Sequence, residues 1–141
     1  MEKNKRYYEF EVPGNSFGDF DKKNIHPGEP GGHPANEKLY QYGIINHFLL
    51  NYPKYKKFAG RVRVTIIAQF KIPVNITQEE EKKMLEEKVS PLQRPDMDNI
   101  SKRVLHSLKN FAYKDDSQVT ELIVQKVYNK LDKIYIKVEE Y

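Results

Sequence analysis

The most regular alternation of hydrophobic and polar residues lies between residues 61 and 71. The hydrophobic side chains there occupy every second position: Val62, Val64, Ile66, Ala68 and Phe70. This period of two predicts a strand with one face in the core. Shorter patterns of the same kind at residues 6–12, 118–128 and 133–141 predict three more strands. Only four residues separate the last two, so we expect them to form an antiparallel hairpin.

Three segments show the signals of helices. Between residues 35 and 51, hydrophobic residues recur every three or four positions, interrupted by Gly43: Leu39, Tyr42, Ile45, Phe48 and Leu49. Residues 77–80 match a capping box and predict a short helix within a charged insertion at 77–90. After Pro95, a stripe at helical spacing predicts the central helix: Ile100, Val104, Leu105, Leu108 and Phe111.

This order of elements predicts one α+β domain, a mixed sheet of about four strands with helices packed on it. At 141 residues the chain is long enough to bury a substantial core. Residues 15–34 are rich in Gly, Pro, Asn, Asp and Lys, so we expect a long loop there. A solvated loop fits its His26 and His33 better than a metal site does, because ligands on a glycine-rich chain need a frame that fixes their geometry.

Composition and charge limit the kinds of partner, metal site and cellular location that we expect for this chain. The net charge of +4 is compatible with nucleic acid as a partner. Five glutamates fall between residues 77 and 88, so the rest of the chain is more basic than the total indicates. The chain has no cysteine, which excludes disulfides and thiolate metal sites. No hydrophobic run is long enough to cross a bilayer and the N-terminal residues lack a signal segment, so we expect a cytoplasmic protein with no membrane partner. The absence of cysteine and the small size fit a bacterial or phage origin.

Two pairs of acidic residues carry the candidate chemistry. Asp96 and Asp98 precede the central helix, and Asp115 and Asp116 follow it. The proline before Asp96 is typical of a helix start, which places Asp96 or Asp98 at the N-cap or in the first turn. Lys102 lies four residues after Asp98, so these two side chains share a face of the helix.

Converging carboxylates of this kind are typical of a metal site for phosphodiester hydrolysis. Two like charges about 4 Å apart repel by roughly 4 kcal/mol at an effective dielectric of about 20, so they need a cation between them. Oxygen ligands favour Mg²⁺, with Mn²⁺ as a substitute. Such an ion activates a bound water and neutralises charge on the phosphate, to which a lysine adds a positive charge. Two structural interpretations stay open, since an aspartate near a helix start also serves as a cap, and Lys102 also suits an ion pair with Asp98.

The run Arg-Pro-Asp-Met-Asp-Asn-Ile-Ser-Lys at 94–102, the helix after it, and Ala-Tyr-Lys-Asp-Asp-Ser-Gln-Val at 112–119 resemble the signature of the RusA family of Holliday-junction resolvases. The resemblance is dense from residue 94 to about residue 128. It implies a homodimer that cuts branched DNA, and a dimer matches the near two-fold symmetry of a four-way junction. It also implies a catalytic set in which the aspartates hold the metal: Asp96, Asp98, Lys102 and Asp116. Asn99 and Asp115 are the supporting residues.

Basic residues at several places are candidate DNA contacts: Lys22, Lys23, Lys54, Lys56, Lys57, Arg61, Arg63, Arg94, Arg103 and Lys114. Lysines neutralise phosphates, and the aromatic residues interleaved with them at 52–58 can stack on exposed bases. The other interpretation of 52–58 is a solvated connector whose aromatic residues cap the preceding helix. The long loop departs from the family, in which a short proline-rich turn and basic residues commonly follow the first strand.

The spacing leaves the assembly and the activity open. If the central helix runs from Asp98 to about Asn110, its length of about 18 Å separates Asp98 from the segment that leads to Asp116. The metal site is then completed by a nearly extended return of the same chain, or it is shared between two subunits. Three activities compete: a junction resolvase of DNA recombination and repair, a metal-dependent nuclease for other branched DNA, and a non-catalytic DNA-binding protein on the same fold.

Overall fold

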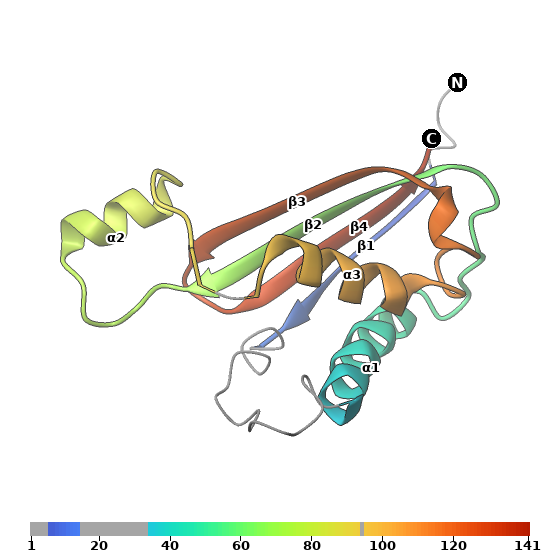
Figure 1. Cartoon of the computed structure of the whole chain (residues 1–141), viewed down its shortest axis with the longest axis horizontal. Coiled ribbons are helices and arrows are strands. Elements are labelled where there is room, and N and C mark those ends of the chain that lie inside the picture. The colour runs from blue at the N-terminus through green and yellow to red at the C-terminus, as the bar shows by residue number, and fades with distance from the viewer. Residues whose placement is uncertain (1–5, 15–33, 94) are drawn as a thin grey trace.

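The described residues form a four-stranded mixed sheet with helices packed on it (Figure 1). The computed structural model of the chain describes residues 6–14, 34–93 and 95–141. The strands are β1 (Tyr7–Pro13), β2 (Val62–Lys71), β3 (Val119–Asn129) and β4 (Lys133–Glu140), and they lie in the order β1-β4-β2-β3. Strand β4 is antiparallel to β1 and β2, whereas β3 is parallel to β2. The predicted α+β class and mixed sheet are therefore confirmed.

Strand β2 has an inner position in the sheet and the most complete hydrophobic face. Val62, Val64, Ile66 and Ala68 are fully buried, and Phe70 is nearly so. The alternation predicted from the sequence is confirmed along the whole strand.

The hairpin predicted for the last two strands is wrong. Strands β3 and β4 run in opposite directions, but β2 lies between them. Their connection crosses the end of β2 and is bonded to it, since Lys71 N donates to Asp132 Oδ1 (2.7 Å) and Gln69 Nε2 donates to the Leu131 carbonyl (2.8 Å). Two strand spacings of about 5 Å each are within reach of this connection. In this arrangement both edges of β2 are hydrogen-bonded, to β3 on one side and to β4 on the other.

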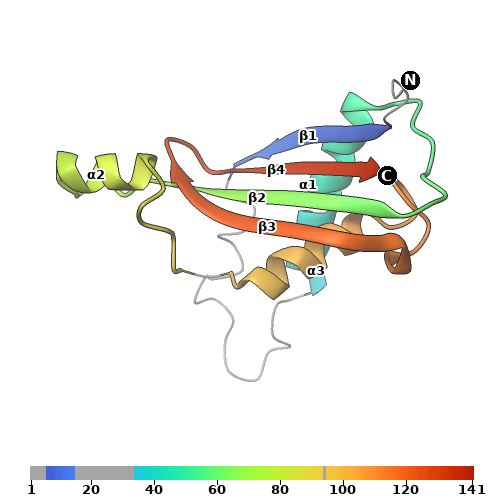
Figure 2. The same cartoon turned by 90° about the horizontal axis from the view of Figure 1, so that it is seen from above.

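Two helices cover one face of the sheet, and the opposite face carries no helix of the described chain (Figure 2). These are α1 (Pro34–Asn51), which packs on β1, and α3 (Met97–Leu108), which packs on α1 and β3. Helix α3 buries Ile100, Val104 and Leu108, as predicted. Leu105 and Phe111 are only half-buried, and Ser107 is buried although the stripe did not include it.

Helix α1 buries a different stripe from the predicted one. Ile44 and Phe48, one turn apart, are completely buried, whereas Tyr42 is 56% exposed. Ile45 and Leu49 are half-buried, and the side chain of Leu39 lies outside the described part. The contacts of Phe48 with the aromatic rings of β1 select this face. The spacing along the chain contains no information about those contacts.

The connector at 52–58 buries Phe58 in the core and packs the half-buried Tyr52 and Tyr55 against it. Tyr8 stacks on Phe58 with ring centroids 4.9 Å apart and contacts Tyr52 at 4.6 Å. Tyr55 packs edge-on against Phe48 at 5.3 Å. Phe58 is therefore not available for stacking on DNA bases, whereas Tyr52 and Tyr55 are half-buried, and these contacts favour the interpretation as a connector that covers the end of the helix. The three lysines of the connector are exposed: Lys54, Lys56 and Lys57.

Helix α2 (Gln78–Leu85) projects beyond the end of the sheet (Figure 1). The predicted capping box is present: the Thr77 hydroxyl accepts from Glu80 N (3.1 Å), and Glu80 Oε1 accepts from Thr77 N (2.9 Å). None of the residues of α2 is buried. Helix α2, with its acidic first turn, lies at the opposite end of the sheet from the connector between α1 and β2.

Several expectations fall on residues 15–33 and 94, which lie outside the described chain. They concern the long loop, with Lys22, Lys23, His26 and His33, and the DNA contact of Arg94. In the described ranges no helix has both the length and the hydrophobicity needed to span a bilayer.

Candidate active site

The first acidic pair lies at the start of α3. Asp96 is the N-cap residue, and its backbone carbonyl accepts from Ile100 N (3.0 Å). Its carboxylate, however, makes no capping hydrogen bond. Asp98 lies in the first turn and accepts from the neighbouring Asn99 N (3.0 Å). Both carboxylates are exposed, and the capping role proposed as the structural alternative for Asp96 is not used.

Lys102 is exposed on α3, one turn after Asp98. Within the described residues no ion pair joins it to Asp98, so this alternative for Lys102 finds no support. The Asn99 side chain is exposed in the same first turn. The start of α3 therefore presents two carboxylates, an amide and an ammonium group to solvent.

The second acidic pair lies in a tight turn after α3. Asn110 adopts a positive φ of 71°, which reverses the chain after the helix end, and η3 (Asp116–Gln118) follows. Asp115 caps η3 by accepting from Ser117 N (2.9 Å), and this interaction holds the pKa of Asp115 below its usual value. Asp115 therefore stabilises the turn that carries Asp116.

Gln118 fixes this turn to the connector between α1 and β2. Its Oε1 accepts from the backbone N–H groups of Lys114 (2.8 Å) and Asp115 (3.0 Å). Its Nε2 donates to the carbonyls of Phe58 (2.8 Å) and Gly60 (2.9 Å). The backbone that carries Asp116 is therefore held in place by four hydrogen bonds from one side chain.

Asp116 itself has an unused carboxylate oxygen. Oδ1 is buried and has no hydrogen-bond partner among the described residues. Oδ2 lies 3.9 Å from His106 Nε2. The neighbouring Tyr113 is buried and donates its hydroxyl to the Leu105 carbonyl (2.9 Å), and burial together with the charge of Asp116 raises the pKa of Tyr113 well above its usual value. A buried, unpaired carboxylate oxygen costs free energy unless a ligand binds it, so the donor set here fits a divalent cation.

The two acidic pairs lie at opposite ends of α3 (Figure 1). His106, which contacts Asp116, is two helical turns after Asp98, about 12 Å along the axis. Across the described ranges, no group of three or more histidine and acidic side chains is close enough to hold one ion. The single chain therefore does not bring Asp116 together with Asp96 and Asp98.

The basic residues predicted to contact DNA differ in whether their charged groups are exposed or already engaged within the chain. Lys114 is exposed beside Asp116, and the connector lies alongside, since Phe58 N donates to the Ala112 carbonyl (2.8 Å). Arg63 instead pairs with Glu121 (2.5 Å) and Glu139 (3.6 Å) across the sheet. Arg61 stacks over the Tyr141 ring at 4.1 Å, and Arg103 is half-buried on α3. A basic surface at the Asp116 end thus consists chiefly of the connector lysines and Lys114.

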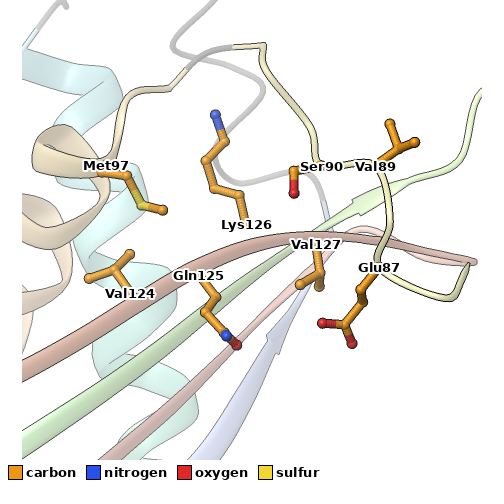
Figure 3. Close-up of a pocket in the computed structure, with 8 residues that line it drawn as sticks. All are labelled: Glu87, Val89, Ser90, Met97, Val124, Gln125, Lys126 and Val127. Carbon is orange, nitrogen blue, oxygen red and sulfur yellow. The ribbon is translucent and has the colours of Figure 1, made fainter. Parts of the chain in front are cut away.

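A shallow hollow lies next to the start of α3 (Figure 3). Its volume is about 230 Å³, and it lies between Met97, the chain at 87–90 and the edge strand β3. Met97, between the two aspartates, contributes its side chain to this hollow and is 44% exposed. The lining is of mixed polarity and contains one carboxylate, Glu87, so it is not itself a metal site.

Sequence reasoning missed two residues of the site. His106 continues the series Asp98 and Lys102 at intervals of four, so its helix face was available from the sequence. Its contact with Asp116 depends on the turn after α3, which the sequence pattern did not define. Gln118 was noticed only as part of the motif, and its role depends on the position of the connector.

Comparison with known proteins agrees with these motifs. The model of a protein family described as "Endodeoxyribonuclease RusA" matches residues 31–139 of the chain. The chain is also similar to a protein of Bacillus subtilis (strain 168) called "Uncharacterized protein YqaN", with 32% identity over 83 residues. This match covers 57% of the chain and 58% of the Bacillus protein, so the similarity spans less than two thirds of that relative.

Proposed function

Because the chain belongs to the RusA endodeoxyribonuclease family, we propose that it is a Mg²⁺-dependent nuclease that resolves four-way DNA junctions in recombination and repair. The observation that carries the proposal is that two carboxylates lack hydrogen bonds that their positions would allow. Asp96 is an N-cap residue whose carboxylate does not cap, and Asp116 has a buried oxygen without a partner among the described residues. The fold leaves both groups for a ligand, and Mn²⁺ would substitute for Mg²⁺.

We propose further that the site is shared between two chains, with Asp96 and Asp98 from one protomer and Asp116 from its partner. Within one chain the two groups lie at opposite ends of α3. A C2 dimer brings opposite ends of two identical elements together when the elements run antiparallel across the axis. Two active centres then face the two opposed strands that junction resolution must cut.

The outer edge of β3 supplies a surface for such a dimer. It has no neighbouring strand in the described chain, and exposed hydrophobic side chains lie along it and beside it at the start of α3: Met97, Leu122 and Ile123. A long hydrophobic edge of this kind favours pairing with another strand. Because β3 begins at Val119, directly after the turn that contains Asp116, and passes Met97 at Val124, antiparallel pairing of two β3 edges would move Asp116 of one protomer toward the start of α3 in its partner.

In this arrangement each residue has a defined task. The three aspartates would hold the ion, and a bound Mg²⁺ would supply an activated water and neutralise phosphate charge. Asp115 and Gln118 keep the Asp116 backbone in its turn. Lys102 would place its ammonium group near the scissile phosphate, and the lysines at the Asp116 end would bind the flanking DNA backbone.

The activity is tested with purified protein on four-way junctions, flaps and linear duplex, each with and without Mg²⁺. We expect paired, symmetric nicks in the junction only, and only with the metal. Cleavage of flaps as efficient as that of junctions would favour the general branched-DNA nuclease. Tight junction binding without any product would favour the non-catalytic protein. The expected cellular setting is the cytoplasm of a bacterium or of a phage-infected bacterium.

Lys102→Ala is expected to slow junction cleavage by roughly a hundredfold, because a positive charge is lost where negative charge develops on the phosphate. The measurement is the single-turnover rate at saturating protein. Lys102→Arg, which keeps the charge on the same face, should retain more activity than the alanine variant. A near-normal rate for Lys102→Ala would remove this residue from the site.

A further inference from the structure

His106 lies beside Asp116 and on the side of α3 that also carries Asp98 and Lys102. Its Nε2 atom is 3.9 Å from Asp116 Oδ2, and the two side chains are 49% and 37% exposed. The imidazole is thus accessible from solvent and adjacent to the carboxylate whose other oxygen has no partner in the described chain. His106 has no role in the reaction proposed above.

The separation of these two atoms is compatible with a common metal ion. With metal–ligand bonds of about 2.1 Å, adjacent ligands of an octahedral ion lie about 3 Å apart and opposite ligands about 4 Å apart. The 3.9 Å distance falls within these limits, and the half-exposed imidazole has room to rotate. Hydrogen bonds of Gln118 and Asp115 hold the turn around Asp116. Coordination of one ion by both side chains therefore requires only a rotation of the His106 side chain.

We propose that His106 supplies a nitrogen ligand to the ion held by Asp116, which makes this a mixed nitrogen and oxygen site with a preference for a divalent transition metal such as Mn²⁺ over Mg²⁺. The inference rests on the proposed function, since it requires a metal at Asp116. Waters, the substrate phosphate and the partner's aspartates complete the coordination.

The chemical basis is the different affinity of the two ions for nitrogen. Mg²⁺ strongly prefers oxygen ligands and keeps most of its waters. Affinity for a site with imidazole rises along the first-row transition metals from Mn²⁺. Replacement of His106 should therefore weaken the binding of Mn²⁺ more than that of Mg²⁺, whereas loss of a purely structural ion pair would change both equally.

The test measures Mn²⁺ binding to the full-length protein by electron paramagnetic resonance, with Mg²⁺ as competitor, and detects bound nitrogen by electron spin-echo envelope modulation. We expect ¹⁴N modulation in the wild type and its loss in His106→Gln and His106→Asp. We also expect the preference for Mn²⁺ over Mg²⁺ to fall roughly tenfold in both variants. His47→Gln is the matched control, because His47 binds a backbone carbonyl within α1, and it should retain the modulation.

The outcomes separate this inference from the proposed function. If Mn²⁺ binds, is released by Asp116→Asn and shows no ¹⁴N modulation in the wild type, His106 is not a ligand although the metal site stands. An unchanged preference for Mn²⁺ in both His106 variants would overturn the inference in the same way. If the wild type binds no Mn²⁺ at all, the metal site and the role of His106 fail together.

Discussion

Asp116→Asn is expected to reduce junction cleavage by a hundred- to a thousandfold while junction binding stays close to that of the wild type. The substitution keeps the shape of the side chain and removes only the negative charge that would hold the metal. Oδ1 is buried without a hydrogen-bond partner within the described chain, so the main change at that atom is the loss of charge. The same outcome is expected for Asp96→Asn, because the native Asp96 carboxylate makes no capping hydrogen bond that the substitution could remove.

The measurement combines single-turnover cleavage with a junction-binding titration on the same samples. Asp115→Asn is the matched control, because it changes the neighbouring residue in the same way. Asparagine caps as well as aspartate does, so the bond to Ser117 N should persist and cleavage should remain near the wild-type rate. Equal loss of cleavage in the Asp115 and Asp116 variants, or loss of binding together with cleavage, would show that the acidic turn is structural.

The sequence was sufficient to predict the elements that rest on local pattern. The alternation in β2, most of the stripe of α3 and the capping box at Thr77 depend on neighbouring residues and appear where they were predicted, although Leu105 and Phe111 are only half-buried. The signature around α3 also identified the family, because order and spacing within one segment are read directly from the chain.

The parts that depend on distant contacts were not predictable in the same way. The short connection after β3 suggested a hairpin, but β2 lies between β3 and β4 and pairs with both, an order that depends on contacts between segments far apart in the chain. Tyr42 has helical spacing with the buried residues of α1, yet contacts of Phe48 with β1 turn it outward. The contact of His106 with Asp116 likewise arises from the turn at Asn110, far from any repeating pattern.

The assembly is the point on which the sequence left two alternatives and the geometry favours one. Asp116 contacts His106, which lies about 12 Å along α3 from Asp98, and movement of the short turn does not remove this length of helix. In the proposed dimer, a second protomer would supply the missing group without distortion of either chain. This requirement explains how a small protein would make two cuts in opposed strands only when both protomers are present.

A mixed dimer of Asp96→Asn and Asp116→Asn chains is therefore expected to regain activity that neither variant has alone. In a shared arrangement one of its two sites combines both substitutions, and the other contains only native aspartates. In a site within one chain, each protomer has one substitution and both sites are inactive.

The measurement uses the two variants, co-expressed with different tags and purified through both, on a four-way junction with Mg²⁺. The shared site predicts nicking at about half of the wild-type rate, in one strand at a time, with both parent homodimers inactive. A mixed dimer as inactive as its parents, although it binds junctions normally, would contradict a site built from two chains.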